Sequence, residues 1–352
     1  MMNEDHAFSY VGCRLKNDIQ NEQGTLLLKE GTVLNEQHVR RLLDMGININ
    51  NYRLNLVPVI GSTLMAPFQQ ELLLNNTVGE IREIFSKVKD NDTVLLEVEK
   101  KVMPVVEQIS LNYDLSTLMN GILCKDDYTY RHNIGVSVLA SLLAKWLGYS
   151  QDEINTISLG GLLHDIGKLD IPDEVLLKKG PLTNQEYETI KRHPVYGYDI
   201  LKKSGHFSDE ICLMALEHHE REDGKGYPYG RAANEIHRYS KIIAIADIFH
   251  AMTSDRVYRG QVALYEVLKQ MKSEAFGKLD PKMTYLFIQR IMEMSIGNQV
   301  YLDDRSIGEI VFIHHDDPIN PVINIAGELI DLRYSQQYIV SFVSFTKQID
   351  IA

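Results

Sequence analysis

Residues 159–168, LGGLLHDIGK, largely decide the fold, because a run of apolar residues ends there in His164 and Asp165. A carboxylate at the end of an apolar helix must meet a cation, a metal ion or strong hydrogen-bond donors, since burying it alone costs several kcal/mol. Asp247 raises the same question, because it interrupts the apolar run 242–249. Both positions therefore predict buried, compensated charge inside a helical domain.

Histidines gather around these two carboxylates. Of the 12 histidines, eight lie between positions 132 and 250, where an even spread over 352 residues would place about four. A single buried histidine is more often a hydrogen-bonded core residue than a ligand, by roughly ten to one. Several imidazoles and carboxylates in one fold reverse that estimate and favour a metal centre. The eight are His132, His164, His193, His206, His218, His219, His237 and His250.

The side-chain types narrow the choice of metal. Imidazole and carboxylate without thiolate suit iron, manganese or zinc, and they argue against a structural zinc site built from cysteines. The two oxygens of Asp165 could bridge two ions about 3.5 to 4 Å apart, the arrangement that activates water for attack on a phosphate ester. The pattern therefore favours hydrolysis of a phosphoester.

An ordered series of motifs resembles the HD-GYP family. The resemblance covers residues 114 to 298 and implies a helical HD-type domain with two divalent metal ions, iron or manganese. The family hydrolyses cyclic di-GMP, and some members prefer other cyclic dinucleotides, so such a dinucleotide is the expected substrate. The motifs are 164–168 (HDIGK) with Ile171-Pro172, His193-Pro194, 218–221 (HHER), 223–228 (DGKGYP) and Ala246-Asp247.

The resemblance also implies roles for single residues. Asp165 is expected to bridge the ions, and Lys168 to face the metals and the scissile phosphate, with a solvated lysine at a helix end as the alternative. In this hypothesis a hydroxide between the ions attacks phosphorus in line, and the products are linear pGpG, GMP, or both. The implied metal ligands are His132, His164, Asp165, His193, His218, His219 and Asp247.

Three further residues are expected to contact the nucleotide. Tyr227 is similar to the family tyrosine near the bound guanine nucleotide, and a plain surface turn is the alternative. Arg256 and Arg259 match the family's phosphate or guanine contacts, for which the planar guanidinium is suited.

Two positions depart from the pattern of the family. His250 stands three residues after Asp247, where most members carry Asp, and on a helix the two positions share a face. Whether His250 supports a ligand, replaces one or weakens the site stays open. Tyr128 lies four residues before His132, where members with a third iron have Glu, so two metals are expected.

Two other functions stay open at this stage. A receptor that binds cyclic dinucleotide without useful turnover is favoured by His250. An HD hydrolase of a different nucleotide would share the first ligands but would not explain His218-His219 together with residues 226–228.

A mainly α protein of three parts is expected. Residues 1–113 form an N-terminal regulatory unit, with an α+β part at 8–60 and a helical connector at 71–112. Residues 114–298 form the phosphodiesterase domain, in which Ser150 and Thr183 open helices through capping boxes. Residues 299–352 form a small β module, in which 314–318 (HHDDP) is a polar turn between strands and not part of the site.

The connector carries an apolar repeat. A homodimer through residues 92–112 and an amphipathic helix packed on its own domain are both consistent with it, and Pro104 would bend a long coiled coil. The repeat has spacings of three and four and consists of Leu95, Val98, Val102, Val105 and Ile109.

Composition limits the partners and the location. The formal charge of −12, from 36 basic and 48 acidic residues, argues against polymeric nucleic acid as a partner. Cys13, Cys124 and Cys212 form no C-x-x-C pair, which is typical of reduced cytoplasmic proteins. The acidic start is unlike a signal peptide, and no apolar run approaches the ~18 residues of a membrane helix. A cytoplasmic protein without membrane insertion is therefore expected.

Overall fold

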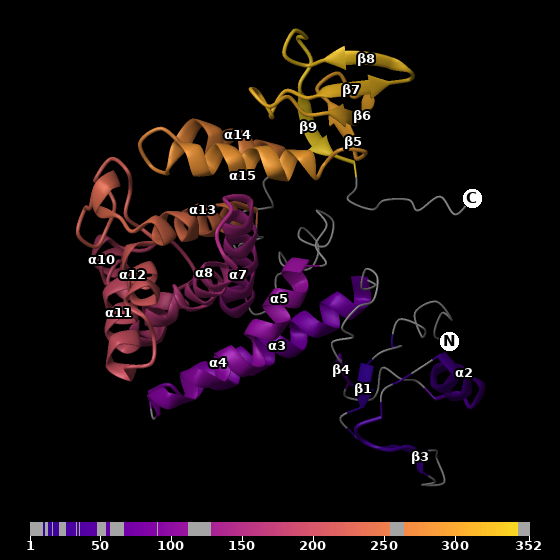
Figure 1. Ribbon diagram of the computed structural model, residues 1–352, viewed down its shortest axis with the longest axis vertical. Helices are drawn as coiled ribbons and strands as arrows, with labels where there is room; N and C mark the ends of the chain where they lie inside the picture. Colours follow the sequence, from indigo (N-terminus) through magenta and orange to yellow (C-terminus); the bar gives the residue numbers. More distant parts are fainter. Residues whose placement is uncertain are drawn as a thin grey trace. The chain divides into compact units, whose positions relative to one another are not determined.

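The computed structural model shows a mostly helical chain with small antiparallel sheets, as the composition and motifs predict (Figure 1). The structure describes residues 10, 13–15, 17–20, 26–32, 34, 36–47, 54–56, 67–89, 91–111, 128–253 and 264–343. Contacts between residues divide the chain into two units, Met1–Glu80 and Ile81–Ala352. The boundaries of the three expected parts stay a prediction.

The first unit contains short strands around one helix. Strand β1 (Cys13–Leu15) pairs with β4 (Leu54–Leu56), and β2 (Ile19–Gln20) pairs with β3 (Leu26–Leu28), both antiparallel. Helix α2 (Glu36–Asp44) buries Val39 and Leu42 and is followed by Gly46, whose φ of 70° is left-handed. Glycine adopts this conformation without a steric penalty, and it ends the helix here. Helix α3 (Pro67–Lys87) begins in this unit.

The centre of the second unit is helix α7. All residues from 131 to 144 are buried, so this helix is covered on every side, and its polar residues are buried with the apolar ones. Helix α8 packs closely on it, because a Cβ on Gly161 would lie 2.9 Å from Ser137 Cα. The core helices are α7 (Tyr128–Trp146), α8 (Gln151–Leu163), α11 (His193–Ser204), α12 (Asp209–Glu217) and α13 (Arg238–Thr253).

Shorter elements connect these helices. Both predicted capping boxes are present, from Ser150 to Glu153 at the start of α8 and from Thr183 to Glu186 at the start of α10. The elements are η3 (Ile166–Asp170), α9 (Asp173–Leu176), α10 (Asn184–Ile190), η4 (Ala233–Glu235), α14 (Leu264–Glu274) and α15 (Pro281–Glu293).

The connector predicted at 71–112 is divided among α3, η2 (Asp92–Leu95), α4 (Leu96–Lys101) and α5 (Met103–Leu111). The break falls next to Pro104, which cannot continue a regular helix without losing a hydrogen bond. Helix α5 contacts α7 and α8. Leu95, Val98, Val102 and Ile109 are buried in the same unit, which is the arrangement of an amphipathic helix packed on its own domain. Dimerisation through this helix stays a prediction.

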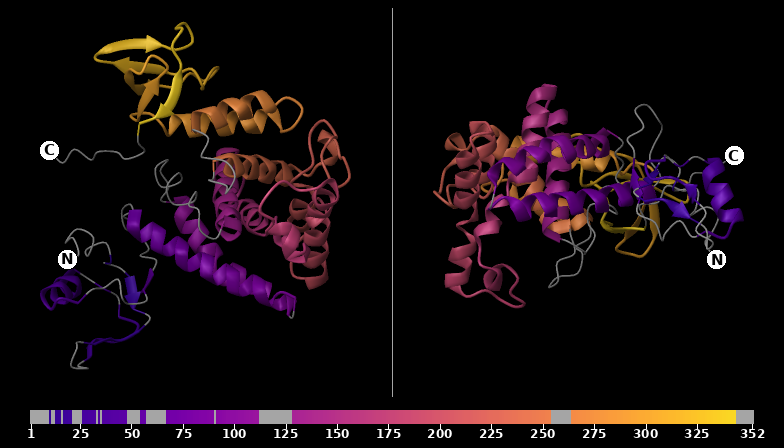
Figure 2. Two further views of the ribbon diagram at one scale, coloured as in Figure 1. Left: turned by 180° about the vertical axis from the view of Figure 1, so that it is seen from behind. Right: turned by 90° about the horizontal axis from the view of Figure 1, so that it is seen from below.

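The last described part is a five-stranded antiparallel sheet in the order β8-β7-β6-β5-β9. It lies beside α14 and α15 in both ribbon views (Figure 2), and the Tyr265 hydroxyl of α14 donates to the Ile319 carbonyl at 3.0 Å. Residues 314–318 form a turn between β6 and β7, as predicted. The strands are β5 (Gln299–Leu302), β6 (Ile307–Phe312), β7 (Val322–Ile325), β8 (Glu328–Asp331) and β9 (Ile339–Phe342).

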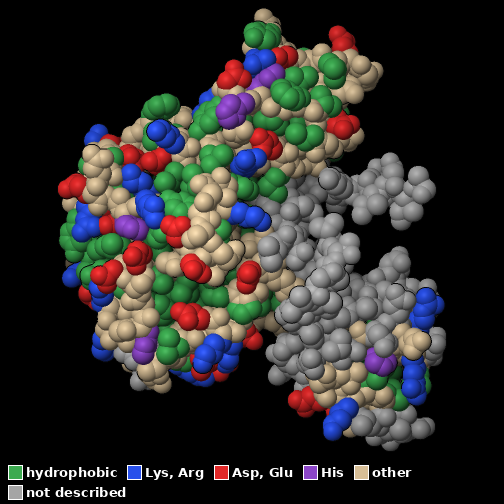
Figure 3. Space-filling model, in the orientation of Figure 1, with side chains coloured by type: hydrophobic (Ala, Val, Ile, Leu, Met, Phe, Trp, Pro, Cys, Tyr) green, Lys and Arg blue, Asp and Glu red, His purple; other side chains and the backbone are tan. Residues whose placement is uncertain are grey.

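Acidic and basic side chains are interspersed over the helical part of the second unit on the face shown in Figure 3. The excess of negative charge is therefore not gathered into one patch on that face. Among the helices that the structure describes, none has both the length and the apolar character of a membrane span.

Candidate metal centre

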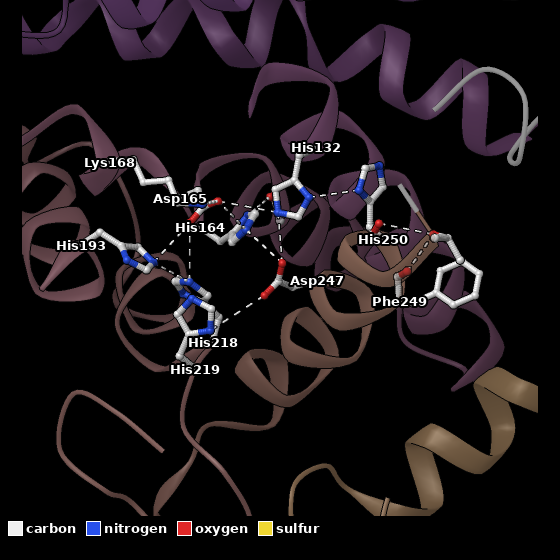
Figure 4. Close-up of polar contacts among 12 residues, drawn as sticks. His132, His164, Asp165, Lys168, His193, His218, His219, Asp247, Phe249 and His250 are labelled. Atoms are coloured by element: carbon white, nitrogen blue, oxygen red, sulfur yellow. Dashed lines mark hydrogen bonds and ion pairs between the residues drawn. The ribbon is translucent and has the colours of Figure 1, made fainter. Parts of the chain in front are cut away.

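Seven side chains converge at one place in the second unit (Figure 4). They come from five separate segments and are mostly buried, with His164 and His193 no more than 1% exposed. His132 lies on α7, His164 and Asp165 follow α8, His193 begins α11, His218 and His219 follow α12, and Asp247 lies on α13.

Asp165 lies between two groups of imidazoles. Its Oδ2 is 3.4 Å from His164 Nε2 and 3.6 Å from His132 Nε2. Its Oδ1 is 3.3 Å from His193 Nε2 and 3.8 Å from His218 Nε2. The carboxylate thus presents one oxygen to each group, as a bridging ligand of two cations must.

Two ligand clusters share this carboxylate. One contains His132, His164 and Asp165, and the other contains Asp165, His193, His218 and His219. In each cluster, the atoms able to bind a metal lie within 4.8 Å of one another. Three or four convergent imidazole and carboxylate groups are the donor set of catalytic iron, manganese or zinc.

Asp247 extends between the same two groups. Its Oδ1 is 3.0 Å from His132 Nε2 and 4.0 Å from His164 Nε2. Its Oδ2 is 3.9 Å from His219 Nδ1 on the opposite side. The buried carboxylate inside the apolar helix α13 is therefore compensated by imidazoles of both clusters.

Backbone carbonyls orient three of the imidazoles. The Nδ1 of His164 donates to Gly161 O at 2.7 Å, that of His193 to Ile190 O at 2.7 Å and that of His218 to Ala215 O at 2.9 Å. A carbonyl can only accept, so Nδ1 carries the proton in each neutral ring. In the neutral form of each ring, Nε2 is then the nitrogen with a free lone pair, and it points to the centre.

Neighbouring charge keeps the carboxylates ionised. Burial by itself raises the pKa of Asp165, but the Lys168 ammonium and His164 outweigh it and hold that pKa well below its usual range. Burial acts in the same direction on Asp247, and its hydrogen bond with His132 contributes most to holding that pKa well below its usual range. Both carboxylates are therefore anionic donors at neutral pH.

Burial keeps most of the imidazoles neutral. It lowers the pKa of His132, lowers that of His218 well below its ordinary value and lowers that of His219 to about 3. His164 differs, because the Asp165 carboxylate outweighs burial and raises its pKa. Neutral imidazole and ionised carboxylate are the protonation states that bind metal.

The donor atoms fit divalent cations. Among the residues that the structure describes, buried His164 Nε2 and Asp165 Oδ1 have no hydrogen-bond partner. Leaving a buried polar atom unsatisfied costs about 1–3 kcal/mol. A cation in each cluster would satisfy both atoms, so these residues are a candidate metal centre.

Lys168 and Tyr227 lie at its edge. The Lys168 ammonium pairs with Asp165 Oδ2, and the side chain is 26% exposed, so it faces the centre. The Tyr227 ring lies 4.6 Å from the His219 ring between centroids, and it lines a cavity of about 230 Å³ together with His218 and His219. Tyr227 therefore does not lie on a plain surface turn.

Two predictions cannot be compared with the structure, since Arg256 and Arg259 lie outside the described residues. A larger cavity of about 520 Å³ lies between α5 and α8 but contains none of the predicted site residues. The smaller cavity beside Tyr227 is the one relevant to the chemistry, because it opens on two of the candidate ligands.

Two buried glutamates were not predicted. Glu217 accepts from Arg231 Nη1, and its Oε2 accepts from His237 N and Ser240 Oγ, both at 2.8 Å. Glu220 accepts from Tyr229 N at 2.8 Å and Arg231 N at 2.9 Å. They hold the loop that carries Tyr227. Glu217 ends an apolar helix as Asp165 does, and this signal was available in the sequence.

The chain is similar in sequence to known proteins. Residues 114–283 match the family model described as "HD domain". A cyclic di-GMP phosphodiesterase of Pseudomonas aeruginosa is 34% identical over 200 residues, 57% of this chain and 48% of that protein. A 3'3'-cGAMP-specific phosphodiesterase of Vibrio cholerae is 39% identical over 184 residues, 51% of this chain and 42% of that protein. The chain spans about half the length of these curated relatives.

The fold has a counterpart among solved structures. An HDG"Y"P protein from Bdellovibrio bacteriovorus superposes with a TM-score of 0.55 at 16% identity, over 80% of this chain and 97% of that one. Residues 114–283 thus match an HD domain in sequence, and the chain shares its fold with this solved structure. The HDIGK motif at 164–168 and Gly226-Tyr227-Pro228 lie within this matched segment and resemble motifs of the HD-GYP family.

Proposed function

We propose that this chain is a metal-dependent phosphodiesterase that hydrolyses cyclic di-GMP to linear pGpG, GMP, or both. The observation that carries the proposal is the position of Asp165, which presents one oxygen to each of two imidazole clusters. Relatives named as cyclic di-GMP and 3'3'-cGAMP phosphodiesterases support the substrate class.

The donor set supports two divalent ions, iron or manganese. His132, His164 and Asp165 would hold one ion, and Asp165, His193, His218 and His219 the other, with Asp247 near both. Two such ions, when bound, supply an activated water and positive charge for the phosphoryl oxygens.

Other side chains act on the substrate directly. The Lys168 ammonium lies beside Asp165 and provides a fixed positive charge where negative charge develops on the phosphoryl oxygens. Tyr227 offers a ring on which a guanine base can stack, beside a cavity that Arg221, Lys225 and Lys278 also line. Such a cavity suits an anionic nucleotide, and Arg256 and Arg259 are proposed to contact it as well.

The proposal is tested by incubating the Mn²⁺- or Fe²⁺-loaded chain with cyclic di-GMP and 3'3'-cGAMP and separating the products. Linear dinucleotide or mononucleotide is expected. Asp165→Asn should lose bound metal and hydrolysis together, whereas Asp209→Asn, whose side chain is 80% exposed, should keep both. Binding of cyclic di-GMP without conversion would contradict hydrolysis and identify the chain as a receptor.

A further inference from the structure

His250 contacts one metal-ligand candidate on the side away from the centre. Its ring is 1% exposed, and its Nδ1 lies 3.0 Å from His132 Nδ1. The Nε2 of His132 points the other way, 3.0 Å from Asp247 Oδ1 and 3.6 Å from Asp165 Oδ2 (Figure 4). His250 therefore hydrogen-bonds to the candidate metal ligand His132 and does not itself point to the candidate metal centre.

The location of His132 in its helix explains why it needs a side-chain partner. His164, His193 and His218 lie where helices end or begin, and each bonds through Nδ1 to a carbonyl three residues earlier. Carbonyls in a last helical turn have no intrahelical partner and are available. His132 lies inside α7 (Tyr128–Trp146), where the carbonyls take part in the helix hydrogen bonds.

The positions of the ring protons distinguish two states of the hydrogen-bonded pair His132 and His250. To bind a cation through Nε2, neutral His132 must carry its proton on Nδ1, and this proton then points at His250 Nδ1. His250 must accept it and keep its own proton on Nε2. In the opposite state, His132 donates Nε2–H to Asp247 and cannot bind metal.

We propose that His250 is the positioning residue of His132: it accepts the Nδ1–H hydrogen bond and so selects the tautomer of His132 that binds metal. The inference rests on the proposed metal centre, and it concerns the ion held by His132, His164 and Asp165. The other cluster contains no His132, so its affinity should not depend on His250.

The test is calorimetric titration of the full chain with Mn²⁺ alone, with no substrate present. His250→Leu removes the acceptor, so His132 shifts to the tautomer that donates to Asp247, and we expect a loss of about 10–100-fold in affinity for one of two ions. His250→Asn should restore the affinity, because Asn Oδ1 lies as many bonds from Cα as His Nδ1 and also accepts. His206→Leu, which changes an exposed histidine, is the matched control.

Equal affinity in the parent chain and His250→Leu would overturn the proposal. Equal losses in His250→Leu and His250→Asn would also overturn it, because packing alone would then explain them. If His250→Leu does not fold, NMR of the Zn²⁺-loaded parent with ¹⁵N-labelled histidine decides: His132 should be protonated at Nδ1 and His250 at Nε2. A proton on His250 Nδ1 refutes the proposal. Mn²⁺ binding is read without hydrolysis, so a failure of the proposed activity would be seen separately.

Discussion

Gly167→Ala is expected to displace a metal ligand without removing one. A Cβ at this position of η3 would lie 2.0 Å from His193 O and 2.3 Å from Gly197 N, both backbone atoms of α11. Contacts below 3.0 Å are essentially never seen for a Cβ, so η3 and α11 must separate by at least 3.0 − 2.0 = 1.0 Å. Because His193 begins α11 and Asp165 precedes η3, this separation widens one metal cluster.

The expected magnitudes follow from that displacement. Overpacking costs about 1–3 kcal/mol, and a clash with two backbone atoms, which cannot rotate away, lies at the upper end. For a unit of this size, about 3 kcal/mol corresponds to a fall of roughly 6–12 °C in melting temperature. A misplacement of 1 Å costs about 100-fold in rate, and we expect that loss in kcat/KM.

Thermal melting measures the loss of stability, Mn²⁺ titration measures the change in metal affinity, and hydrolysis of cyclic di-GMP measures the change in kcat/KM. Gly197→Ala is the matched control, since its nearest contact would be 3.3 Å from Gly167 N, and its stability should change by less than about 1 kcal/mol. A Gly167→Ala chain that melts like the parent and binds Mn²⁺ with the same affinity would refute the close packing of η3 on α11.

Three further predictions concern the same unit. Lys168→Met should lower kcat by about 10²–10³-fold with metal content unchanged, and metal analysis beside steady-state kinetics checks this. Glu220→Gln should raise KM more than it lowers kcat, because the loop with Tyr227 loses an acceptor for two backbone N–H groups; an unchanged KM would contradict this role. Removal of metal by chelation should lower the free energy of unfolding by about 2.7 kcal/mol for each site, compared with the chain in Mn²⁺ at 100 times its Kd. Denaturant unfolding measures this difference. The Asp165→Asn chain should show no change on chelation.

The convergence of the candidate metal ligands was the most predictable feature of the molecule. Asp165 follows an apolar helix and Asp247 lies within one, and buried ionised groups need compensation wherever they lie. The positions of these two aspartates in the sequence therefore indicated that cationic or hydrogen-bonding groups must lie around them. His132 was different, because only the resemblance to a family indicated it. Its surroundings in the sequence are those of an ordinary amphipathic helix.

Loop geometry and packing partners were less predictable. Glu220 holds its loop through backbone N–H groups of Tyr229 and Arg231, and every residue type except proline offers such a donor. No side-chain pattern could therefore reveal the contact. The repeat in the connector showed that Leu95, Val98 and Ile109 need an apolar surface, but not which one. That surface is the molecule's own domain.

Backbone carbonyls orient three of the five imidazoles that are candidate metal ligands, so their orientation depends little on neighbouring side chains during evolution. A carbonyl at a helix end is retained through almost any substitution, so the candidate metal ligands can stay oriented while side chains that line the cavity beside Tyr227 vary. New substrate preferences would then require changes around Tyr227 and not a rebuilt centre. Relatives named for two different cyclic dinucleotides are compatible with such a division of labour.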